Sequence, residues 1–284
     1  MTGATRGIGR AAARRLATLG ADVVIVGRDE RLLDDTLAEL RRASANDRAS
    51  AIRIDLASMS SIRKGAAEIT HRWPAIHVLV NNAGVNVKRR TTSPDGRELT
   101  LAVNHLAPFL LTSLLAPSLV HGAPSRVVNV TSIFAHFGRV HLDDLELGRR
   151  AYDPTRAYNQ SKLANLMFTL DFAERLRGTG VTANCVSPGL VATDLMREHW
   201  WMTAPVLRRV WDRVLLTAEQ AADRVVEVAM SAALEGVSGQ VLSGSGKRLR
   251  IPRRALDPDA RRRLWELSAI MTAAPRLPAR GSIR

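Results

Sequence analysis

The sequence predicts a doubly wound α/β protein, in which helices cover both faces of a parallel sheet. Three observations lead to this fold class. Short apolar runs rich in valine and isoleucine alternate with amphipathic stretches, a glycine-rich turn opens the first helix, and polar or turn-forming residues follow most apolar runs. With 284 residues, of which 46% are hydrophobic, the chain can bury the core of one such domain.

The expected elements follow from residue type and period. Short β-branched runs favour strands, and the amphipathic stretches between them favour helices. Strands are expected at 21–26, 51–54, 76–80, 126–130, 181–186 and 240–242. Helices are expected at 10–19, 31–42, after 55 to about 72, 98–119, 154–176 and from 217 onward. The last begins at Thr217, whose spacing to Gln220 is that of a capping box.

The glycine-rich turn from Thr2 to Gly9 predicts a phosphate-binding loop. In such a turn, backbone N–H groups and the N-terminus of the following helix hold a pyrophosphate. The buried strand that normally precedes the turn is not found, because only Met1 stands before Thr2. Since that strand lies in the middle of the sheet, we expect two unpaired strand edges in the core and a true start upstream of Met1.

The charge distribution argues against a nucleic-acid partner. The formal net charge is +14, but lysine accounts for only four of the 41 basic residues and aromatic residues for 4% of the chain. A nucleic-acid binder concentrates its basic residues and interleaves them with aromatic ones, whereas these arginines are spread along the chain. We therefore expect no nucleic-acid partner.

Other residue types exclude further classes of protein. The single cysteine, Cys185, excludes a disulfide framework and favours a cytoplasmic location. His136 and His141 lack metal-ligand spacing, so no metal site is expected. The longest uncharged run, Leu106 to Val120, contains two prolines and is too short to span a bilayer. It predicts a buried helix and no stable membrane insertion.

Polar or turn-forming residues stand where the expected strands end. In an open parallel sheet, ligands bind in the crevice at the carboxyl ends of the strands. The residues at these ends are Arg28, Asp55, Asn81, Ser132 and Pro188. The arrangement indicates one ligand that crosses several strands.

Tyr158 and Lys162 form the candidate catalytic pair. Their separation of four residues places both on one face of the expected helix 154–176. A nearby ammonium favours the phenolate, so Lys162 is expected to lower the pKa of Tyr158. Such a tyrosine exchanges a proton with an alcohol or carbonyl oxygen, and Ser132 follows the preceding strand.

Taken in order, these motifs resemble the short-chain dehydrogenase/reductase family, whose doubly wound fold is of the Rossmann type. They are Thr2-Gly-x-x-x-Gly7-Ile8-Gly9, Asn81-Asn82-Ala83-Gly84, Asn104, Ser132, Tyr158-x-x-x-Lys162 and Pro188-Gly189. Four further segments resemble the retinol-dehydrogenase-like branch of the family, namely 95–98 (DGRE), 104–112 (NHLAPFLLT), 157–165 (AYNQSKLAN) and 263–268 (RLWELS).

The resemblance implies a role for each matching residue. Tyr158 would be the general acid in reduction and the base in oxidation. Lys162 would lower its pKa and hold the ribose of the nicotinamide. Ser132 would bind the substrate oxygen, and Asn104 would hold a water that relays protons to Lys162. The cofactor-binding residues would be Gly3, Thr5, Arg6, Gly7, Ile8, Gly9, Arg28, Asp55, Leu56, Asn81, Ala83, Gly84, Tyr158, Lys162, Pro188, Gly189 and Thr193.

The charge after the second strand of this fold favours NADP(H) as cofactor. An NAD site places an acidic residue there, whereas an arginine suits the 2′-phosphate of NADP. Arg28 stands at this position and Arg6 lies in the glycine loop, so two guanidinium groups would converge on the phosphate. Asp29 follows one residue later, and its side chain is expected to point elsewhere.

Apolar residues near the expected site favour a lipophilic alcohol, aldehyde or ketone as substrate. Phe134, His136 and Phe137 follow the catalytic serine. The segment after Gly189 closes over the substrate in this family, and here it contains Leu195, Met196, Trp200, Trp201 and Met202. The alternative is that the tryptophans pack the lid or a subunit contact.

The expected organisation is one dinucleotide-binding and catalytic domain, residues 1–246, followed by a peripheral basic tail with a short helix, residues 247–284. We expect an NADP(H)-dependent oxidoreductase that forms a homo-oligomer through the helices of Asn104 and Tyr158. The alternative is an N-terminally truncated, non-catalytic binding or regulatory protein. The missing strand favours this alternative, and the complete set of Ser132, Tyr158 and Lys162 argues against it.

Overall fold

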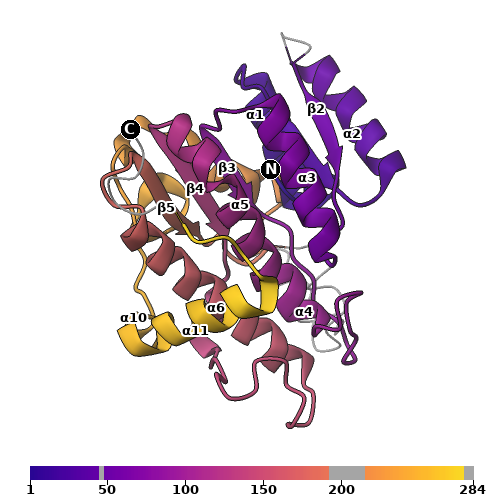
Figure 1. The fold of residues 1–284 in the computed structure, drawn as a ribbon. Helices are drawn as coiled ribbons and strands as arrows, with labels where there is room; N and C mark the ends of the chain where they lie inside the picture. The colour runs from indigo at the N-terminus through magenta and orange to yellow at the C-terminus, as the bar shows by residue number, and fades with distance from the viewer. Residues whose placement is uncertain (45–47, 192–214, 278–284) are drawn as a thin grey trace, which may run out of the picture.

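The computed structural model describes residues 1–44, 48–191 and 215–277, and it confirms the doubly wound α/β fold (Figure 1). All strand pairs are parallel, in the orders β1–β2 and β3–β4–β5–β6. The strands are β1 (Val24–Gly27), β2 (Ser50–Arg53), β3 (Val78–Asn81), β4 (Ser125–Val130), β5 (Val181–Val186) and β6 (Val241–Leu242). Each overlaps a strand that the sequence predicts.

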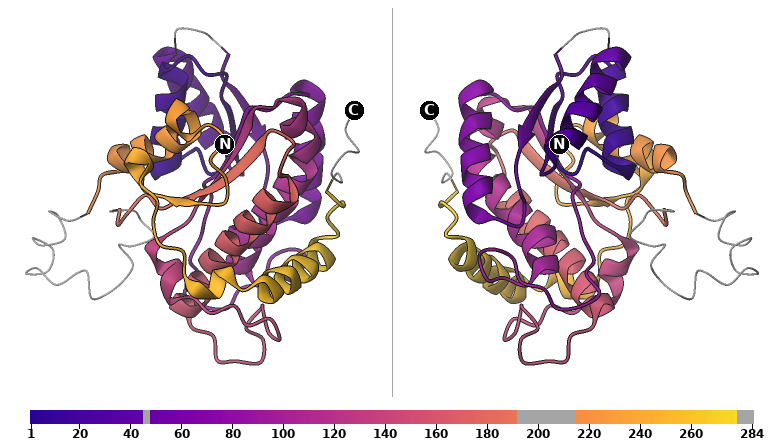
Figure 2. Two further views of the ribbon diagram at one scale, coloured as in Figure 1. Left: turned by 90° about the vertical axis from the view of Figure 1, so that its left-hand side faces the viewer. Right: turned by 90° about the vertical axis from the view of Figure 1, so that its right-hand side faces the viewer.

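Helices cover both faces of the sheet (Figure 2). The longer ones are α1 (Gly7–Thr18), α2 (Glu30–Ala43), α3 (Met59–Arg72), α5 (Ala107–His121), α6 (Pro154–Arg175), α9 (Ala218–Met230) and α11 (Pro258–Thr272). Short helical pieces are α4 (Leu99–Leu101), the π-turn η1 (Ala102–Leu106), η2 (Ile133–Phe137), η4 (Ala232–Leu234), η5 (Gly244–Gly246) and α10 (Arg253–Leu256). The predicted capping box at Thr217 opens α9.

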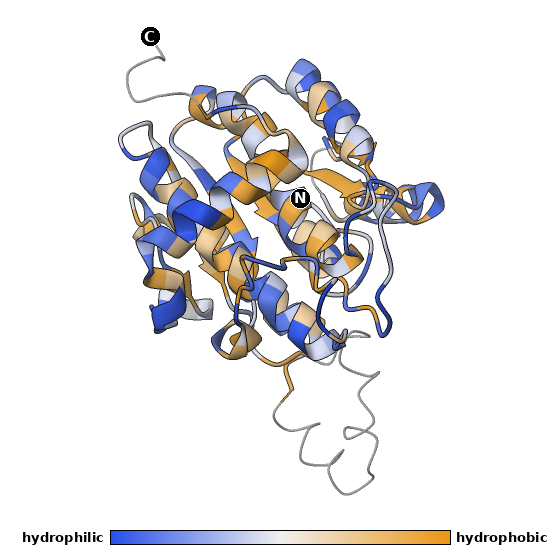
Figure 3. Cartoon of the chain, turned by 60° about the horizontal axis from the view of Figure 1, so that its bottom comes forward, coloured by the Kyte–Doolittle hydropathy of each residue, from blue (hydrophilic) through white to orange (hydrophobic). Residues whose placement is uncertain are grey.

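The core consists of two hydrophobic clusters, one on each face of the sheet. One cluster contains residues of α1, α2 and α9, and the larger one contains residues of α3, α5, α6 and α11. Figure 3 shows mostly hydrophobic strands between helices whose outer turns are hydrophilic. This is the pattern of a sheet buried on both faces.

Residues Met1–Gly3 lie between β1 and β3, where the sequence led us to expect a missing strand. The backbone N–H of Val26 donates to the carbonyl of Met1 (2.9 Å), and that of Gly3 donates to the carbonyl of Val26 (3.1 Å). On the other side, the N–H of Thr2 donates to the carbonyl of Val80 (2.9 Å). These bonds join the two groups of strands, so the edges are paired over this short stretch rather than left open.

The run α4–η1–α5 is the expected central helix. Within the described residues, its segment Leu99–His121 is the one helix long and apolar enough to cross a membrane, with a mean hydropathy of 1.6. However, 89% of that window is buried inside the fold. A helix that is apolar on all sides is typical of the core of a protein of this size as well as of a membrane.

The segment after Lys247 is packed more closely than the expected peripheral tail. Ala255 and Leu264 are buried members of the larger hydrophobic cluster. Figure 1 shows α11 lying across α6, and the ring of Trp265 lies 4.8 Å from that of Phe109 in α5. At the other end of α11, Arg63 donates to the carbonyl oxygens of Thr272 (2.6 Å) and Ala273 (2.7 Å). One face of the tail helix, with Leu264, Ser268 and Thr272, therefore packs against the core, and its other residues are half-buried or exposed.

This packing changes the expectation for oligomer contacts. Residues 159–173 of α6 are all buried within the chain itself, and so is most of α5. The helices of Asn104 and Tyr158 therefore present no open face over these stretches, and the expected contact between subunits is not available there.

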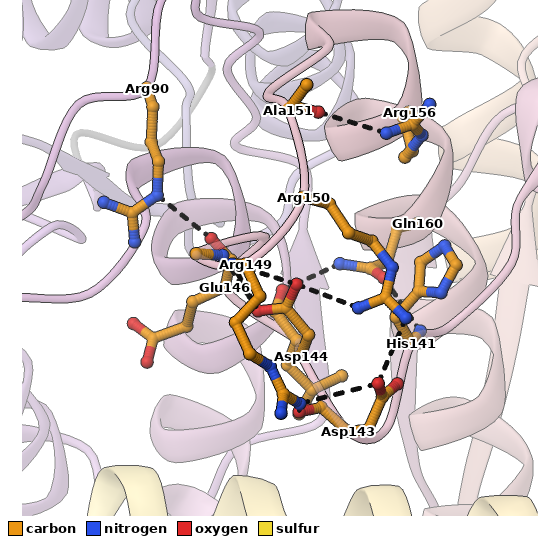
Figure 4. A network of polar contacts seen from close by, with 12 residues as sticks. Arg90, His141, Asp143, Asp144, Glu146, Arg149, Arg150, Ala151, Arg156 and Gln160 are labelled. Atoms are coloured by element: carbon orange, nitrogen blue, oxygen red, sulfur yellow. Dashed lines mark hydrogen bonds and ion pairs between the residues drawn. The ribbon is translucent and has the colours of Figure 1, made fainter.

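The loop 138–153, between β4 and α6, is held by a network of polar contacts (Figure 4). Arg150 pairs with Asp143 (3.0 Å) and Asp144 (2.9 Å), and its hydrogen bond lowers the pKa of the Asp143 carboxyl. Gln160 of α6 donates to the carbonyl of Leu145 (2.8 Å) and accepts from the N–H of His141 (2.9 Å). The loop is thus tied to the helix that contains Tyr158.

Candidate active site

A cleft of about 660 Å³ runs along the carboxyl ends of the strands. Its lining confirms that most of the predicted site residues lie together. The predicted residues that line it are Gly3, Thr5, Arg6, Gly7, Ile8, Gly9, Arg28, Asp55, Leu56, Ala83, Gly84, Ser132, Tyr158, Lys162, Pro188 and Gly189. Of the others, Asn81 and Asn104 lie behind the lining, and Thr193 falls outside the described residues.

The glycine loop is compact because its glycines leave no room for side chains. Gly3 has a positive φ of 63°, and a Cβ there would stand 2.8 Å from the Cα of Ala83. A Cβ on Gly9 would overlap the carbonyl oxygen of Gly3 and the amide of Asn82. The loop therefore brings the backbone to the floor of the cleft, and any larger residue would push the turn open.

The loop leads directly into the N-terminus of α1, which faces the cleft. Arg6 is its N-cap residue but makes no side-chain cap hydrogen bond, and the first turn contains no acidic residue. The first N–H groups of a helix have no partner within the helix, and the helix dipole favours negative charge there. The residues Gly7, Ile8 and Gly9 thus present a site for an anion.

The side chain of Asn81 lies away from the cleft, and that of its neighbour Asn82, for which the sequence predicted no role, lies at the lining. Asn81 was expected to bind cofactor, but its side chain is buried and donates to Thr112 (2.9 Å) and to Asn129 (2.8 Å). Asn82 lines the cleft instead, and it donates to the carbonyl oxygens of Thr2 and Gly3, at 3.1 Å each. The Asn81 side chain therefore bonds to buried neighbours inside the fold, and the Asn82 side chain fixes the backbone of the glycine loop.

The arginines predicted to read the cofactor stand at one end of the cleft. Arg6 and Arg28 both line it and are exposed, and neither guanidinium pairs with a carboxylate among the described residues. Asp29 points elsewhere, as expected, because its side chain accepts from the N–H of Leu32 (3.1 Å) and caps α2. This end of the cleft therefore carries positive charge.

Asp55 keeps its carboxylate near the same end of the cleft. One carboxylate oxygen accepts from the N–H of Ala57 (2.9 Å), and the backbone N–H of Asp55 donates to Ser61 (2.9 Å). These bonds fix the turn after β2, so that Asp55 and Leu56 remain at the cleft wall.

The catalytic candidates meet at the opposite end of the cleft. Tyr158 and Lys162 extend from the same face of α6, and the Lys162 Nζ lies 5.6 Å from the centroid of the tyrosine ring. Lys162 is buried and donates to the carbonyl of Val130 (3.1 Å). Ser132 follows β4 and lines the same cleft as Tyr158, and its hydroxyl accepts from the N–H of Phe134 (3.3 Å). The spacing of four residues thus places Tyr158 and Lys162 on one face of the helix, as predicted.

Burial controls the protonation of this pair. It raises the pKa of Tyr158 to about 12, against a smaller opposite effect from Ser132, and lowers the pKa of Lys162 to about 8. The sequence led us to expect a lowered tyrosine pKa, and this is not what the structure shows. The reason is that burial removes water from the phenolate, and this effect exceeds the opposite effect of Ser132.

Asn104 lies directly behind the cleft in the π-turn. Its amide donates to the carbonyl of Val85 (2.9 Å) and to Ser161 (3.0 Å), and its oxygen accepts from the N–H of Val85 (2.8 Å). A Cβ on Gly84 would stand 3.4 Å from both the Asn104 oxygen and the Lys162 nitrogen. Asn104 and Lys162 therefore border the same small space.

Comparison with known proteins agrees with this geometry. The family model of the short chain dehydrogenases matches residues 1–203. The chain is 40% identical over 280 residues to polyprenol dehydrogenase of Mus musculus, covering 96% of this chain and 83% of the relative. It is 38% identical over 268 residues to retinol dehydrogenase 12 of Homo sapiens, with coverages of 94% and 84%. The chain belongs to the short-chain dehydrogenase family. These relatives place it in the retinol-dehydrogenase-like branch.

Solved structures show the same fold. An uncharacterised protein from Mycobacterium paratuberculosis superposes with a TM-score of 0.79 at 30% identity, over 98% of this chain and 93% of the other. RhlG of Pseudomonas aeruginosa, solved with NADP in its active site, superposes with a TM-score of 0.69 at 25% identity, over 85% and 92%.

The residues of this short-chain dehydrogenase fit a nicotinamide dinucleotide, NAD(P)(H), as its cofactor. The glycine loop and the uncapped start of α1 would hold the pyrophosphate. Asp55, Leu56, Ala83 and Lys162 line the same cleft; the first three would face the adenosine, and Lys162 would face the nicotinamide ribose. The cofactor would bring a transferable hydride to the end of the cleft where Tyr158 stands.

The catalytic end of this dehydrogenase is walled by residues that the sequence did not single out. Within the described chain, these are Val85, Asn86, Val103, Thr155, Asn159, Leu190, Val191 and Ala218. The helical period could have identified Thr155 and Asn159, which share the face of Tyr158 on α6. The side-chain oxygens of Asn86 and Asn159 are buried without a hydrogen-bond partner.

Aromatic residues after the catalytic serine divide into two kinds. Phe134 lines the cleft, and its ring lies 6.2 Å from that of Tyr158 in an edge-on arrangement. Phe137 is 69% exposed and is not part of the lining. The apolar residues 195–202 predicted to close over the substrate lie outside the described residues. In the part of the chain that is described, no cluster of His, Cys, Asp or Glu could hold a metal ion.

Proposed function

We propose that this chain is an NADP(H)-dependent oxidoreductase that interconverts a lipophilic alcohol and the corresponding carbonyl compound. The observation that carries the proposal is the convergence of Ser132, Tyr158 and Lys162 in the same cleft as the glycine loop. A binding protein has no need for a buried lysine beside a half-buried tyrosine.

Each catalytic side chain then has one task. In reduction, Tyr158 donates its hydroxyl proton to the substrate oxygen, while Ser132 holds that oxygen by a hydrogen bond. Lys162, with a pKa of about 8, is mainly charged at neutral pH and stabilises the phenolate that forms. The bound dinucleotide supplies the hydride. In oxidation, the proton returns to Tyr158.

The preference for NADP(H) is supported by the charges at the far end of the cleft. Arg6 and Arg28 have no acidic partner there among the described residues, and Asp29 is occupied as a helix cap. Two guanidinium groups suit a 2′-phosphate, which forms charge-assisted hydrogen bonds. That RhlG was solved with NADP agrees with this choice.

A lipophilic substrate is supported by the apolar wall at the catalytic end. Phe134, Val103 and Val191 line the cleft, and the ring of Phe134 lies 6.2 Å from that of Tyr158. The names of the two relatives, polyprenol dehydrogenase and retinol dehydrogenase 12, refer to long apolar alcohols. The substrate proposed here is of the same chemical class.

The decisive experiment measures turnover and cofactor binding separately. The chain is assayed with NADPH or NADH against a series of aldehydes of increasing chain length, and thermal melts are recorded with each cofactor. A ligand that binds the native state raises the melting temperature. We expect turnover with NADPH, and we expect Tyr158→Phe to lose it while keeping the NADPH-dependent shift. A shift without turnover in the unaltered chain would support the non-catalytic alternative.

Assembly and location are further proposals. A homo-oligomer, if it forms, would use surfaces other than the buried stretches of α5 and α6. Cys185 is a buried free thiol, which is compatible with the proposed cytoplasmic location. Light scattering in solution and localisation of a tagged chain test the two proposals.

A further inference from the structure

The π-turn Ala102–Leu106 directs three successive side chains to three different places. Val103 lines the cleft, Asn104 is bound to Val85 and Ser161, and His105 faces the C-terminal helix α11. All three are buried. A change in the conformation of the turn would therefore move Val103 at the cleft wall and Asn104 beside Lys162.

His105 is a buried titratable group that the proposed chemistry does not use. Its Nε2 lies 2.7 Å from the hydroxyl oxygen of Ser268 in α11. Because the Ser268 hydroxyl donates to the carbonyl of Leu264 (2.7 Å), its oxygen must accept from the imidazole. His105 therefore carries its proton on Nε2, and its buried Nδ1 has no hydrogen-bond partner in the described chain.

The imidazole is also enclosed by aromatic rings and remains neutral. Its ring centroid lies 6.3 Å from that of Phe109 and 6.4 Å from that of Phe168. Burial lowers the pKa of His105 to about 3. At neutral pH the imidazole is therefore uncharged, and its Nε2–H remains the donor to the Ser268 hydroxyl.

We propose that His105 and Ser268 are positioning residues for the active site. Their hydrogen bond joins α11 to the π-turn and so holds Asn104 in place against Val85 and Ser161. The tail helix thereby acts on the cleft without contacting it.

The geometry of a π-turn explains why such an anchor is needed. A π-turn contains one residue more than the α-helix around it, and it persists where surrounding contacts favour it. If the turn relaxed to an α-helix, the residues before it would rotate by about 100° about the helix axis relative to those after it. The Asn104 amide would then leave Val85, and the floor around Gly84 would lose its support.

Ser268→Ala is the direct test, because it removes the hydrogen-bond acceptor of His105 and leaves the helix intact. Thr272→Val is the matched control. Thr272 also lies buried on α11, and its hydroxyl donates to the carbonyl of Ser268 (2.7 Å); among the described residues no hydrogen bond joins its side chain to the π-turn. Ser268→Thr restores a hydroxyl at the anchoring position.

Two readouts separate positioning from general destabilisation. By hydrogen–deuterium exchange, we expect amides 102–106 to exchange about tenfold faster in Ser268→Ala, with no such change in Thr272→Val. In NADPH-dependent turnover, we expect kcat to fall about tenfold in Ser268→Ala with the KM for NADPH unchanged. Thr272→Val should lower the melting temperature to a similar extent and leave kcat unaltered, and Ser268→Thr should recover most of both readouts.

The outcomes distinguish this proposal from the proposed function, on which the kinetic readout rests. Equal exchange at 102–106 in the two variants, or an equal loss of kcat at an equal loss of melting temperature, would overturn the positioning role. If the unaltered chain shows no turnover with any carbonyl compound, the proposed function fails, and the exchange measurement still decides whether Ser268 holds the π-turn.

Discussion

Lys162 donates a hydrogen bond from Nζ to the carbonyl oxygen of Val130, 3.1 Å away. This bond ties the ammonium to the end of β4, two residues before Ser132. It also explains why the lysine can remain charged although burial lowers its pKa to about 8. The charge of Lys162 therefore changes at mildly alkaline pH, whereas Tyr158, with a pKa of about 12, keeps its proton there.

The first prediction concerns the pH dependence of the reduction. The charged form of Lys162 stabilises the phenolate, and it is lost as the pH rises through about 8. We expect kcat/KM with NADPH to be level at neutral pH and to decline above that value. Lys162→Arg keeps a positive charge and should move the decline to higher pH. An identical alkaline decline in both proteins would assign it to another group.

Cofactor preference provides the second prediction. Arg28→Asp removes a guanidinium and supplies a carboxylate that would accept hydrogen bonds from the ribose hydroxyls of NADH. We expect kcat/KM with NADPH to fall about tenfold or more, because Arg28 would no longer donate to the 2′-phosphate and hydrogen bonds to charged groups contribute about 1.5–3 kcal/mol. The value with NADH should not fall. Arg31→Asp makes the same change in charge on α2, outside the cleft lining. An equal loss of kcat/KM in that variant would indicate an effect of net charge rather than a contact of Arg28 with the 2′-phosphate.

The third prediction tests the apolar wall. Phe134→Ala removes a ring beside Tyr158, and burial of a phenylalanine-sized surface contributes about 1.5–3 kcal/mol. We expect kcat/KM for long-chain aldehydes to fall about 10- to 100-fold, with little change for short ones. Phe137→Ala, at an exposed position outside the lining, should behave like the unaltered chain. The ratio of long-chain to short-chain kcat/KM is the quantity to measure in both variants.

The fourth prediction concerns stability in acid. The pKa of His105 is lowered from 6.5 to about 3 in the folded chain, so between these values the unfolded chain binds a proton that the folded chain does not. Stability must therefore decrease as the pH falls from about 6.5, by roughly 1.4 kcal/mol for each pH unit. His105→Gln should remove this contribution from denaturant melts recorded along the pH range. His136→Gln, at an exposed position, should leave the slope unaltered.

The chain pattern predicted the sheet and the catalytic pair because both depend on local spacing. The apolar runs gave each strand, and four residues of helix were enough to bring Tyr158 and Lys162 together. The same reasoning placed the side chain of Asn81 in the cleft, whereas that of Asn82 lies there. Neighbouring residues at the end of a strand face opposite ways, and which one meets the ligand depends on the register of β3 in the sheet.

Long-range packing accounts for the other differences. The sequence predicted a peripheral basic tail with a short helix at 247–284, because the burial of Leu264 and Ser268 depends on α5 and α6, which lie far earlier in the chain. The pKa of Tyr158 was expected to fall, since a sequence shows that a lysine is near but not that water is excluded. The π-turn at Asn104 has no local signal that distinguishes it from an α-helix.

The place of α11 also determines when the fold can be completed during synthesis. The ribosome makes a chain from its N-terminus, and domains acquire their structure as segments emerge. Until α11 has left the ribosome, the sides of Phe109 and Phe168 that it covers face solvent, and the π-turn has no anchor. The catalytic half of this protein is therefore finished last, although its residues are made in the middle of the chain.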